Sequence, residues 1–386
     1  MLPLNLTKVL HGIRTMGRQA WLEKQLNQAF FEARRGKTKT VNENLYETNH
    51  ILNTVKLAQT IMDKTYRPSP SITFVIRDPM IREIFAAPFR DRIVHHFIYN
   101  ITAGWWDQCF INDSYSCRLG KGTLYGIKRL QTQMREAKKE YRKAHIVKLD
   151  LKGYFMSLNR KKLYHLAQTG LKEQFKPYQQ DIDAQWLYEI CRFLWEQTIF
   201  DDPIKNVRRK GSIHDWDDLP PEKSLFCQKP GVGIVIGNLT SQLLSNIMLN
   251  QLDHYVTEYL GYKYYGRYVD DFYLIVADSD YEHFKKVDLH RIENFLMGLG
   301  LTLHPKKRYM QPVERGVQFL NARVYLNCLY PSDRLQAKFK RAMQECIAGQ
   351  RDIDSLIAYL GLMHHLDAKR FVKKVFEANG QDYRFY

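Results

Sequence analysis

The sequence predicts an α+β fold centred on a small sheet with helices on one of its faces. Three stretches predict its main strands: "HIVKLDL" ends in an acid, Asp150, and "YKYYGRY" and "FYLIVAD" form a hairpin whose bend carries Val269, Asp270 and Asp271. The order strand, two helices, hairpin, helix, strand is that of a split βαβ, or ferredoxin-like, domain. In this arrangement the end of the first strand lies beside the hairpin bend, so we expect Asp150 and Asp270 to converge.

The composition is that of a folded protein large enough for a substantial buried core. Of the 386 residues, 45% are hydrophobic and 26% are charged, which excludes an intrinsically disordered chain. A chain of this length is expected to form two or three subdomains. The sequence contains no internal repeat and no low-complexity tract.

An excess of basic residues indicates a polyanionic partner. The formal net charge is +17, from 58 Lys and Arg against 41 Asp and Glu, and a field of this size attracts nucleic acid. The 24 Tyr, 20 Phe and 6 Trp supply flat surfaces for base stacking, although most aromatic side chains belong to the core. A solvated basic surface without a partner is the alternative explanation of the charge.

The cysteines and the N-terminus favour a cytoplasmic protein. The six cysteines form no C-x-x-C pair and are too far apart in the sequence to suggest a zinc site, so we expect reduced thiols. The first residues, "MLPLNLTKVLHGIRTMG", lack the apolar block of a signal peptide, and no uncharged run is long enough for a membrane span. We therefore expect no membrane partner.

The segments around the predicted sheet are mainly helical in pattern. Residues 17–62 have helical spacing, "SITFVIRDP" alternates like a strand, and "REIFAAPFRDRIVHHFIYNITAGWW" returns to helical periodicity. Residues 201–230, rich in Pro, Gly and Asp, are expected to form a long loop or hairpin before the helix "GNLTSQLLSNIMLNQLDHYVTEYL". "GVQFLNARVYLN" predicts a further strand pair, and residues 332–386 predict a basic helical segment.

The convergence of carboxylates predicts a metal site. Unpaired like charges repel, and hard oxygen ligands of this kind select Mg²⁺. Two metal ions about 4 Å apart can activate an attacking hydroxyl and stabilise the leaving oxygen of an in-line phosphoryl displacement. The expected hydroxyl is a primer 3′-OH and the expected leaving group is pyrophosphate. The alternative is that Asp270 and Asp271 are ordinary residues of a hairpin bend, where Asp is common.

Several blocks of the sequence resemble those of reverse transcriptases. "YYGRYVDDFYLIV" resembles their Y-x-D-D block, and "HIVKLDLKGYF" resembles the upstream block with the first catalytic acid. In the same order, "FRDRIVHHFIYN" and "SYSCRLGKGTLYGI" resemble the two fingers blocks, "GLTLHPKKRYM" the lysine block and "GVQFLNARVY" the primer grip. The resemblance implies a right-hand polymerase with an N-terminal extension and fingers in 1–144, a ferredoxin-like palm in 145–330 that includes the 201–230 insert, and a short helical thumb in 331–386.

The block before the long helix is similar to one subgroup of that family. Most reverse transcriptases have a Q-G-x-x-x-S-P pattern there, whereas this chain has "IGNLTSQ", which is similar to the enzymes of diversity-generating retroelements. In that subgroup the residue at the position of Ile236 lies against the incoming nucleotide, and the enzymes misincorporate opposite template adenine. A branched apolar side chain cannot make the hydrogen bonds of a Gln amide, so we expect low fidelity. The chain departs from the family pattern at Val235, where Pro is frequent, and at Arg308, where Thr or Ser is common.

The resemblance also implies roles in catalysis. The expected catalytic residues are Asp150, Asp270, Asp271 and Lys307. The three acids, with the backbone carbonyl of Leu151, would hold two Mg²⁺ ions, for which Mn²⁺ is able to substitute. Lys307 would protonate the leaving pyrophosphate, and its neighbour Lys306 is the alternative.

A second set of residues is implied to bind the nucleotide. These are Arg92, Arg118, Lys121, Tyr154, Phe155, Ile236, Gly237, Asn238 and Gln242. Arg92 and Arg118 would grip the triphosphate through guanidinium forks. Phe155 would exclude the ribose 2′-OH, with Tyr154 as the alternative. Asn238 would hold template or nucleotide, or else it simply caps the following helix.

The function implied is an RNA-directed DNA polymerase that makes cDNA from a template RNA within a diversity-generating retroelement. Its expected partners are the template RNA, the RNA–cDNA duplex, deoxynucleotides and a small accessory protein encoded nearby. One alternative is another bacterial reverse transcriptase, of the retron, group II intron-like or phage-defence type. The other is a catalytically silent RNA-binding relative.

Overall fold

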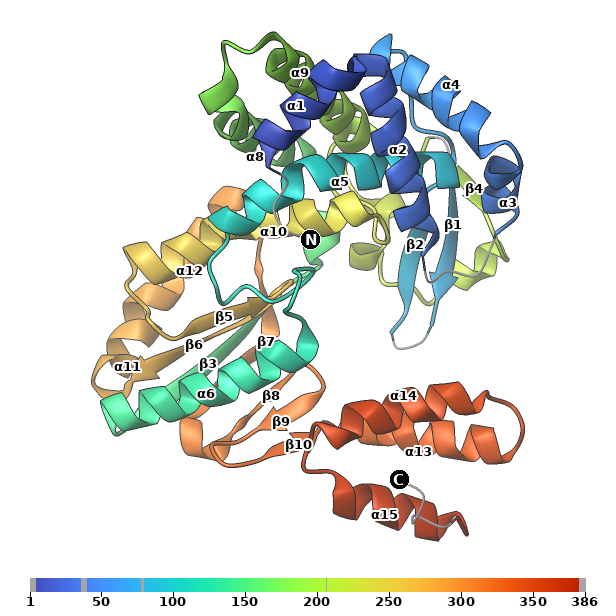
Figure 1. Cartoon of the computed structure of the whole chain (residues 1–386). Helices are drawn as coiled ribbons and strands as arrows, with labels where there is room; N and C mark the ends of the chain where they lie inside the picture. Colours follow the sequence, from blue (N-terminus) through green and yellow to red (C-terminus); the bar gives the residue numbers. More distant parts are fainter. Residues whose placement is uncertain (1–4, 36–39, 78–79, 206, 382–386) are drawn as a thin grey trace. The chain divides into compact units, whose positions relative to one another are not determined.

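The computed structural model describes residues 5–35, 40–77, 80–205 and 207–381 (Figure 1), so the predicted segments 1–144, 201–230 and 331–386 include residues outside the description. The chain separates into two units that alternate along the sequence. The first unit comprises Met1–Ile111, Leu151–His254 and Glu293–Leu303, and the second comprises Asn112–Asp150, Tyr255–Ile292 and His304–Tyr386. The predicted division into fingers, palm and thumb stays a prediction.

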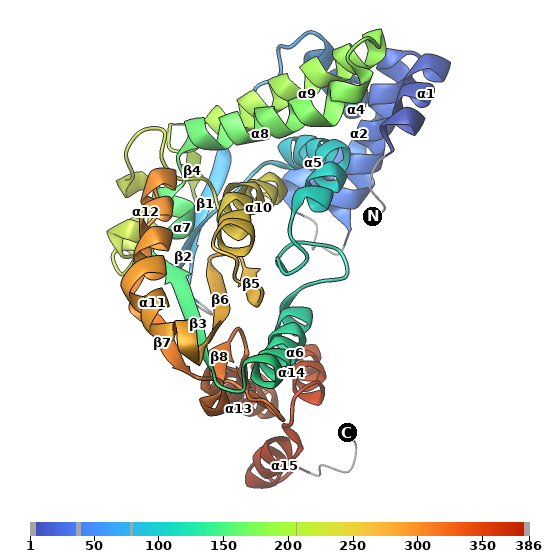
Figure 2. The ribbon, with the colours of Figure 1, turned by 90° about the vertical axis from the view of Figure 1, so that its left-hand side faces the viewer.

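Helices make up most of the first unit. They are α1 (Leu6–Met16), α2 (Arg18–Arg34), α3 (Val41–Thr48), α4 (His50–Met62), α5 (Phe89–Cys109), α7 (Tyr154–Ser157), α8 (Arg160–Phe175), α9 (Ile182–Phe200) and α10 (Leu239–His254). In α2 the fully buried Leu22, Leu26, Ala29 and Ala33 recur at helical spacing, and this face packs against α5. Helices α8 and α9 run side by side (Figure 2). The prediction of helices across residues 17–62 is confirmed for the part of that range that the structure describes.

The first unit also contains a three-stranded sheet. β1 (Ser71–Ile76) pairs antiparallel with β2 (Arg82–Ala86) and parallel with β4 (Val207–Arg209). The prediction that the chain is helical from Arg82 onward is wrong, because Arg82–Ala86 is a strand and α5 begins only at Phe89. Pro88 disfavours the helical conformation in the residue before it, so the helix cannot extend back, and pairing with β1 satisfies the preceding backbone groups.

Glu83 of β2 bonds the 201–230 insert to the rest of the first unit. Besides β4, the insert forms three short turns of 3-10 helix, Ile213–Trp216, Pro221–Lys223 and Leu225–Cys227. The fully buried Glu83 carboxylate accepts hydrogen bonds from Trp216 Nε1 at 2.6 Å, Ser224 Oγ at 3.1 Å and the Leu225 N–H at 2.6 Å. Three donors offset the desolvation of a carboxylate. These bonds attach residues 216–225 of the insert to the sheet of this unit.

The sheet of the second unit has the strand order β5–β6–β3–β7 (Figure 1). Its strands are β3 (Ala144–Leu151), β5 (Tyr265–Tyr268), β6 (Asp271–Ala277) and β7 (Leu303–Pro312). β5 and β6 form the predicted hairpin, and β3 pairs antiparallel with β6 from Ala144 opposite Ala277 to Asp150 opposite Asp271. α6 (Thr123–Tyr141) packs against β5 and β6. The prediction that the first strand and the hairpin are neighbours is confirmed.

The identity of the last strand differs from the prediction. The strand beside β3 is β7, which was not expected to be a strand, whereas the predicted strand pair "GVQFLNARVYLN" belongs to a separate sheet of order β10–β9–β8. That sheet comprises β8 (Val317–Phe319), β9 (Ala322–Val324) and β10 (Leu329–Pro331). β7 lies at a sheet edge and, apart from Leu303, its side chains are half-buried or exposed, so no apolar alternation marks it in the sequence.

The C-terminal segment of the second unit is a bundle of three helices. They are α13 (Asp333–Ile347), α14 (Ile353–His364) and α15 (Lys369–Ala378). Their buried apolar side chains, such as Phe339, Met363 and Phe376, form a core of their own. Helices α11 (Tyr281–His283) and α12 (Leu289–Leu299) follow the hairpin. The prediction that the segment after β10 is helical is confirmed for the residues described.

Two further features concern the chain as a whole. All six cysteines lie in the described part and are free thiols; Cys191 is buried, whereas Cys117 and Cys227 are exposed. Among the helices formed by the described residues, none is both long enough and apolar enough to cross a lipid bilayer.

Candidate active site

The sheet of the second unit brings two carboxylates together at one end. Asp150 near the end of β3 is the register partner of Asp271, the first residue of β6. Residues directly opposite on antiparallel strands point to the same face, with Cβ atoms about 5 Å apart. Tyr268 also pairs with Asp271, so the hairpin bend consists of Val269 and Asp270 alone. The third acid, Asp270, therefore adjoins the pair.

Strand alternation explains why these acids share one face. Ile146, Lys148 and Asp150 follow one another at every second position of β3, and Ile146 and Asp150 lie opposite Ile275 and Asp271 of β6. Ile146 and Ile275 belong to a buried apolar cluster that includes side chains of α6. Along this face the sheet thus passes from an apolar core to a charged end, and the acids are at the charged end.

Two lysines contact the acids. The Nζ of Lys307 lies 2.9 Å from Asp150 Oδ1, and the Nζ of Lys148 lies 3.1 Å from Asp271 Oδ2. Lys148 is largely buried and its ammonium also lies over the Tyr309 ring, 5.6 Å from the centroid, whereas the Lys307 side chain is 50% exposed. Lys307, rather than its neighbour Lys306, is the lysine that the structure places against an acid.

Asp271 is in an environment that disfavours its ionised form. Burial raises the pKa of Asp271 to about 7, and the nearby Asp150 and Asp270 act in the same direction, while Lys148 opposes them. Its Oδ1 atom is buried and accepts no hydrogen bond from the described residues. An uncompensated carboxylate oxygen beside two other acids is an environment that a divalent cation would stabilise.

The acids do not by themselves complete a metal site. Across the described ranges, no three or more His, Cys, Asp or Glu side chains are gathered closely enough to hold an ion. Mg²⁺ in phosphoryl-transfer sites is usually held by one or two carboxylates, with water and substrate phosphates filling the remaining positions. The pair of Asp150 and Asp271, with Asp270 next to them, fits that kind of incomplete site.

The loop before α6 carries two of the predicted nucleotide-binding residues. Arg118 Nη1 donates to the Ser114 carbonyl at 3.1 Å, and Lys121 Nζ contacts the carbonyl and, at 3.1 Å, the Oδ1 of Asn112. Both cations belong to the second unit, as the acids do. Their side chains fold over the backbone of their own loop.

The predicted residues Arg92, Tyr154 and Phe155 belong to the first unit. Arg92 Nε donates to the Ala87 carbonyl at 2.9 Å, and burial lowers the pKa of its guanidinium. The Tyr154 side chain is buried and its hydroxyl donates to the Ser245 carbonyl at 2.8 Å. Tyr154 is therefore a packing residue, which leaves the half-buried Phe155 as the better candidate for contact with a sugar.

The remaining predicted residues surround the start of α10, also in the first unit. The Ile236 carbonyl accepts a hydrogen bond from the Phe85 N–H at 3.3 Å. Gly237 has a φ of 123°, a backbone conformation that other residues rarely adopt, so the motif favours glycine there. Gln242 is exposed on the first turn of α10. Asn238 lines a small cavity.

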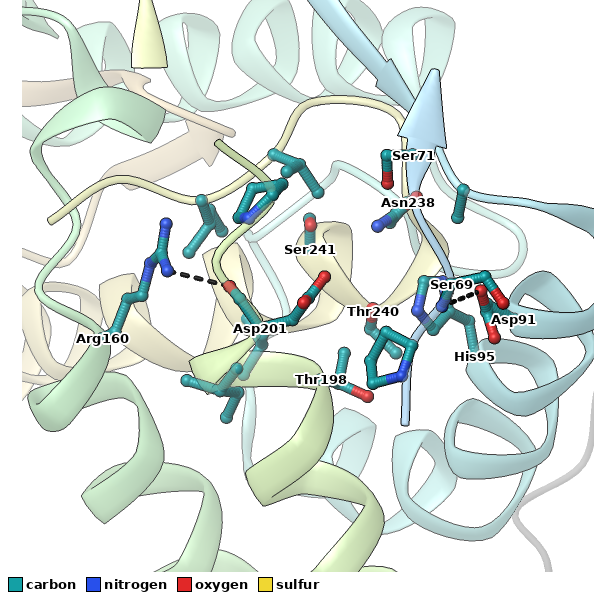
Figure 3. Close-up of a pocket in the computed structure, with 17 residues that line it drawn as sticks. Ser69, Ser71, Asp91, His95, Arg160, Thr198, Asp201, Asn238, Thr240 and Ser241 are labelled. Carbon is teal, nitrogen blue, oxygen red and sulfur yellow. Dashed lines mark hydrogen bonds between the residues drawn. The ribbon is translucent and has the colours of Figure 1, made fainter. Parts of the chain in front are cut away.

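This cavity, of about 40 Å³, is lined by buried and half-buried polar side chains, among them Asp91, His95, Arg160, Asp201, Asn238 and Ser241 (Figure 3). Asp91 accepts hydrogen bonds from the Tyr66 hydroxyl at 2.9 Å and the Ser69 N–H at 2.8 Å. Burial raises the pKa of Asp201 to about 6, and the charge of Asp91 adds to the effect. Burial lowers the pKa of His95 to about 4. A volume of this size accommodates water rather than a nucleotide.

The sequence prediction missed three residues that shape the acid site. Lys148 lies two positions before Asp150, so strand alternation would have placed it on the same face. Arg267 is the single charged residue between Tyr264 and Val269, and a charge inside an apolar strand is a signal of its own. Ser116, which contacts the hairpin bend, carries no such signal, because a serine in a polar loop is ordinary.

Comparison with known proteins gives a distant likeness. No known family model and no curated protein matches the sequence. The structure is similar to that of apo telomerase from Candida tropicalis, with 13% identity, a TM-score of 0.46, and coverage of 70% of this chain and 50% of that chain. It is also similar to telomerase from Candida albicans in complex with a fragment of telomeric RNA, with 12% identity, a TM-score of 0.46, and coverage of 78% and 54%. The chain spans about half the length of these two proteins.

Asp201→Asn is expected to change how stability depends on pH. Between pH 3.8, the usual pKa, and about 6, the folded chain retains a proton on Asp201 that the unfolded chain has lost. The free energy of unfolding of the wild type therefore falls as the pH rises through this window. Asn does not titrate, so the variant does not lose stability through this residue as the pH rises. The difference in Tm, variant minus wild type, should therefore increase by roughly 2–4 °C between pH 4.5 and pH 7.5 in calorimetry.

The control is Ser241→Ala, which changes the same cavity without removing a titratable group. Its Tm difference from wild type should be the same at both pH values. A Tm difference for Asp201→Asn that does not change with pH would contradict the assigned environment of this carboxyl.

Proposed function

We propose that this chain is an RNA-directed DNA polymerase that transfers nucleotides at the acid site of the second unit. The observation that carries the proposal is the register pairing of Asp150 with Asp271, with Asp270 in the adjoining bend and Asp271 Oδ1 buried without a partner. A sheet selected for stability alone has no reason to place two acids directly opposite each other, with a third acid next in the sequence. The net charge of +17 supports a nucleic-acid substrate.

The proposed cofactor is a pair of Mg²⁺ ions, which when bound would lower the pKa of a primer 3′-hydroxyl and neutralise developing charge. Asp150, Asp270 and Asp271, with the Leu151 carbonyl, would hold them. Lys307 would leave Asp150 for the departing pyrophosphate and donate its proton there. Its half-exposed side chain suits this change of partner, whereas the largely buried Lys148 would remain the counter-ion of Asp271.

The proposed substrate is a template RNA copied with deoxynucleotides, in a diversity-generating retroelement with a small accessory protein. The motif Ile236–Gln242 supports this subtype, since it has an apolar side chain at the position where most reverse transcriptases have Gln. Arg92, Arg118 and Lys121 would bind the triphosphate, and Phe155 would exclude the ribose 2′-OH. The presence of all three acids, two of them paired across the strands, favours an active enzyme over a silent RNA-binding relative.

Asp150→Asn and Asp270→Asn are each expected to abolish primer extension. Either change removes a negative charge from a site whose proposed work depends on holding cations, so kcat should fall by roughly a thousandfold or more. The measurement is extension of a primed RNA by the purified protein with Mg²⁺ and deoxynucleotides, with any accessory protein encoded nearby added. Asp278→Asn, an acid at the other end of the same strand pair, is the matched control and should extend normally. Equal extension by the Asp270→Asn variant would refute the assignment.

Ile236→Gln is expected to lower misincorporation opposite template adenine. The Gln amide would supply side-chain hydrogen bonds that select for correct base-pair geometry, which an isoleucine side chain cannot make. Sequencing of the cDNA made from a defined adenine-containing RNA measures the error spectrum, and Ile236→Leu, which adds no amide, should keep the wild-type spectrum. An unchanged error rate in Ile236→Gln would remove Ile236 from the account of fidelity.

A further inference from the structure

The bend that carries Asp270 has a strained backbone. Val269 has a φ of 56°, in the left-handed region, which a β-branched side chain rarely adopts. It stands between Tyr268, which pairs with Asp271, and Asp270. Strain of this kind persists only where surrounding groups over-determine the conformation. The groups that do so here come from outside the hairpin bend.

Arg267 contacts the carbonyl side of Val269. Its side chain has no exposed surface, its Nη1 donates to the Val269 carbonyl at 3.0 Å, and its Nη2 donates to Ser114 Oγ at 3.1 Å. A buried guanidinium is tolerated only where its N–H groups are bonded, and its planar fork then has little freedom to move. Arg267 therefore fixes the direction of the Val269 carbonyl relative to the preceding loop.

Ser116 contacts the amide side of the same residue. Its Oγ accepts a hydrogen bond from the Val269 N–H at 3.2 Å. Both backbone polar groups of Val269 are thus bonded to side chains that lie outside the bend. Together, the two bonds determine the orientation of the peptide groups on either side of Val269, and hence the direction in which the chain enters Asp270.

The segment that supplies the two serines is itself firmly attached. It runs beside β5, with the Arg267 N–H donating to the Asp113 carbonyl at 2.9 Å and the Tyr115 N–H donating to the Arg267 carbonyl at 2.9 Å. The Asp113 carboxylate accepts hydrogen bonds from Arg129 Nε at 2.8 Å and Gln133 Nε2 at 3.0 Å, both on α6. A continuous set of bonds therefore links α6 to the bend.

We infer that Arg267 and Ser116 are positioning residues that hold Val269 in its strained conformation, so that Asp270 and Asp271 face Asp150. Neither residue needs to touch substrate for this role. The inference rests on the proposed polymerase function, because only a reaction at these acids gives the strained bend a purpose. It also gives the "SYSCRLG" and "GRYVDD" segments, distant in sequence, a shared role at the bend.

The first test is kinetic and uses Ser116→Ala and Arg267→Lys, the latter keeping the charge but losing the fork. Misplaced carboxylates should lower kcat on the order of tenfold to a hundredfold. The KM for the deoxynucleotide should change little, and the Mg²⁺ concentration for half-maximal activity should rise. Full wild-type kcat in both variants would overturn the inference.

The second test separates positioning from general stability. Glycine adopts a positive φ without strain, so Ser116→Ala/Val269→Gly should recover much of the kcat lost in Ser116→Ala. The control is Ser332→Ala, which removes another buried serine hydroxyl of the second unit, one that accepts the Leu335 N–H at 3.3 Å. Val269→Gly should not restore any loss in that background. Restoration in the control, or none in the Ser116 double variant, would contradict the role.

Hydrogen exchange at the Val269 amide keeps the inference testable if the protein shows no polymerase activity. The amide should exchange slowly in wild type and faster in Ser116→Ala and Arg267→Lys. Slow exchange in a wild type that never extends a primer would support the positioning of Val269 by Arg267 and Ser116, and it would refute the polymerase proposal. Fast exchange in a wild type that extends primers would refute the positioning role of these two residues and leave the polymerase proposal unchanged.

Discussion

Two carboxylates, those of Asp150 and Asp271, lie directly opposite each other on neighbouring strands of the second unit, and their repulsion is the constraint that the surrounding residues must offset. Like charges in register destabilise a sheet, and burial of Asp271 adds to the cost. Two ammonium groups partly offset this repulsion: Lys148 pairs with Asp271, and Lys307 pairs with Asp150. The compensation is incomplete, since Asp271 Oδ1 accepts no hydrogen bond within the described chain. A sheet optimised for stability alone would not keep this arrangement.

Backbone strain occurs at the same place as the charge repulsion. Val269 has a conformation that its side chain disfavours, and buried bonds from Arg267 and Ser116 hold it there. The strained backbone at Val269 and the opposed carboxylates thus lie within a few residues of one another. Two unfavourable features at one place are typical of a functional site. The rest of the unit supplies rigidity: the apolar face of the sheet packs against α6, and α6 in turn anchors Asp113 and the loop it belongs to.

The sequence was informative where apolar periodicity was strong. The alternation in "HIVKLDL" and "FYLIVAD" predicted β3, the hairpin and their pairing. The residue opposite Asp150 is nevertheless Asp271 rather than the predicted Asp270, because β6 begins at Asp271 and the bend is one residue shorter than expected. It failed where tertiary contacts decide the structure. "REIFA" is a strand because of its pairing with β1, and β7 is a polar edge strand without an apolar pattern. The contacts of Arg267 and Ser116 join segments about 150 residues apart, a distance that no local pattern encodes.

The most direct test of the central claim is an anomalous diffraction measurement on crystals of the full chain containing Mn²⁺. The account predicts a strong peak within ligand distance, about 2.2 Å, of carboxylate oxygens from both Asp150 and Asp271. It also predicts that Lys307 no longer contacts Asp150 in that crystal. A map in which residue 150 lies apart from the 269–271 bend, or in which no manganese peak lies between their carboxylates, would contradict the account.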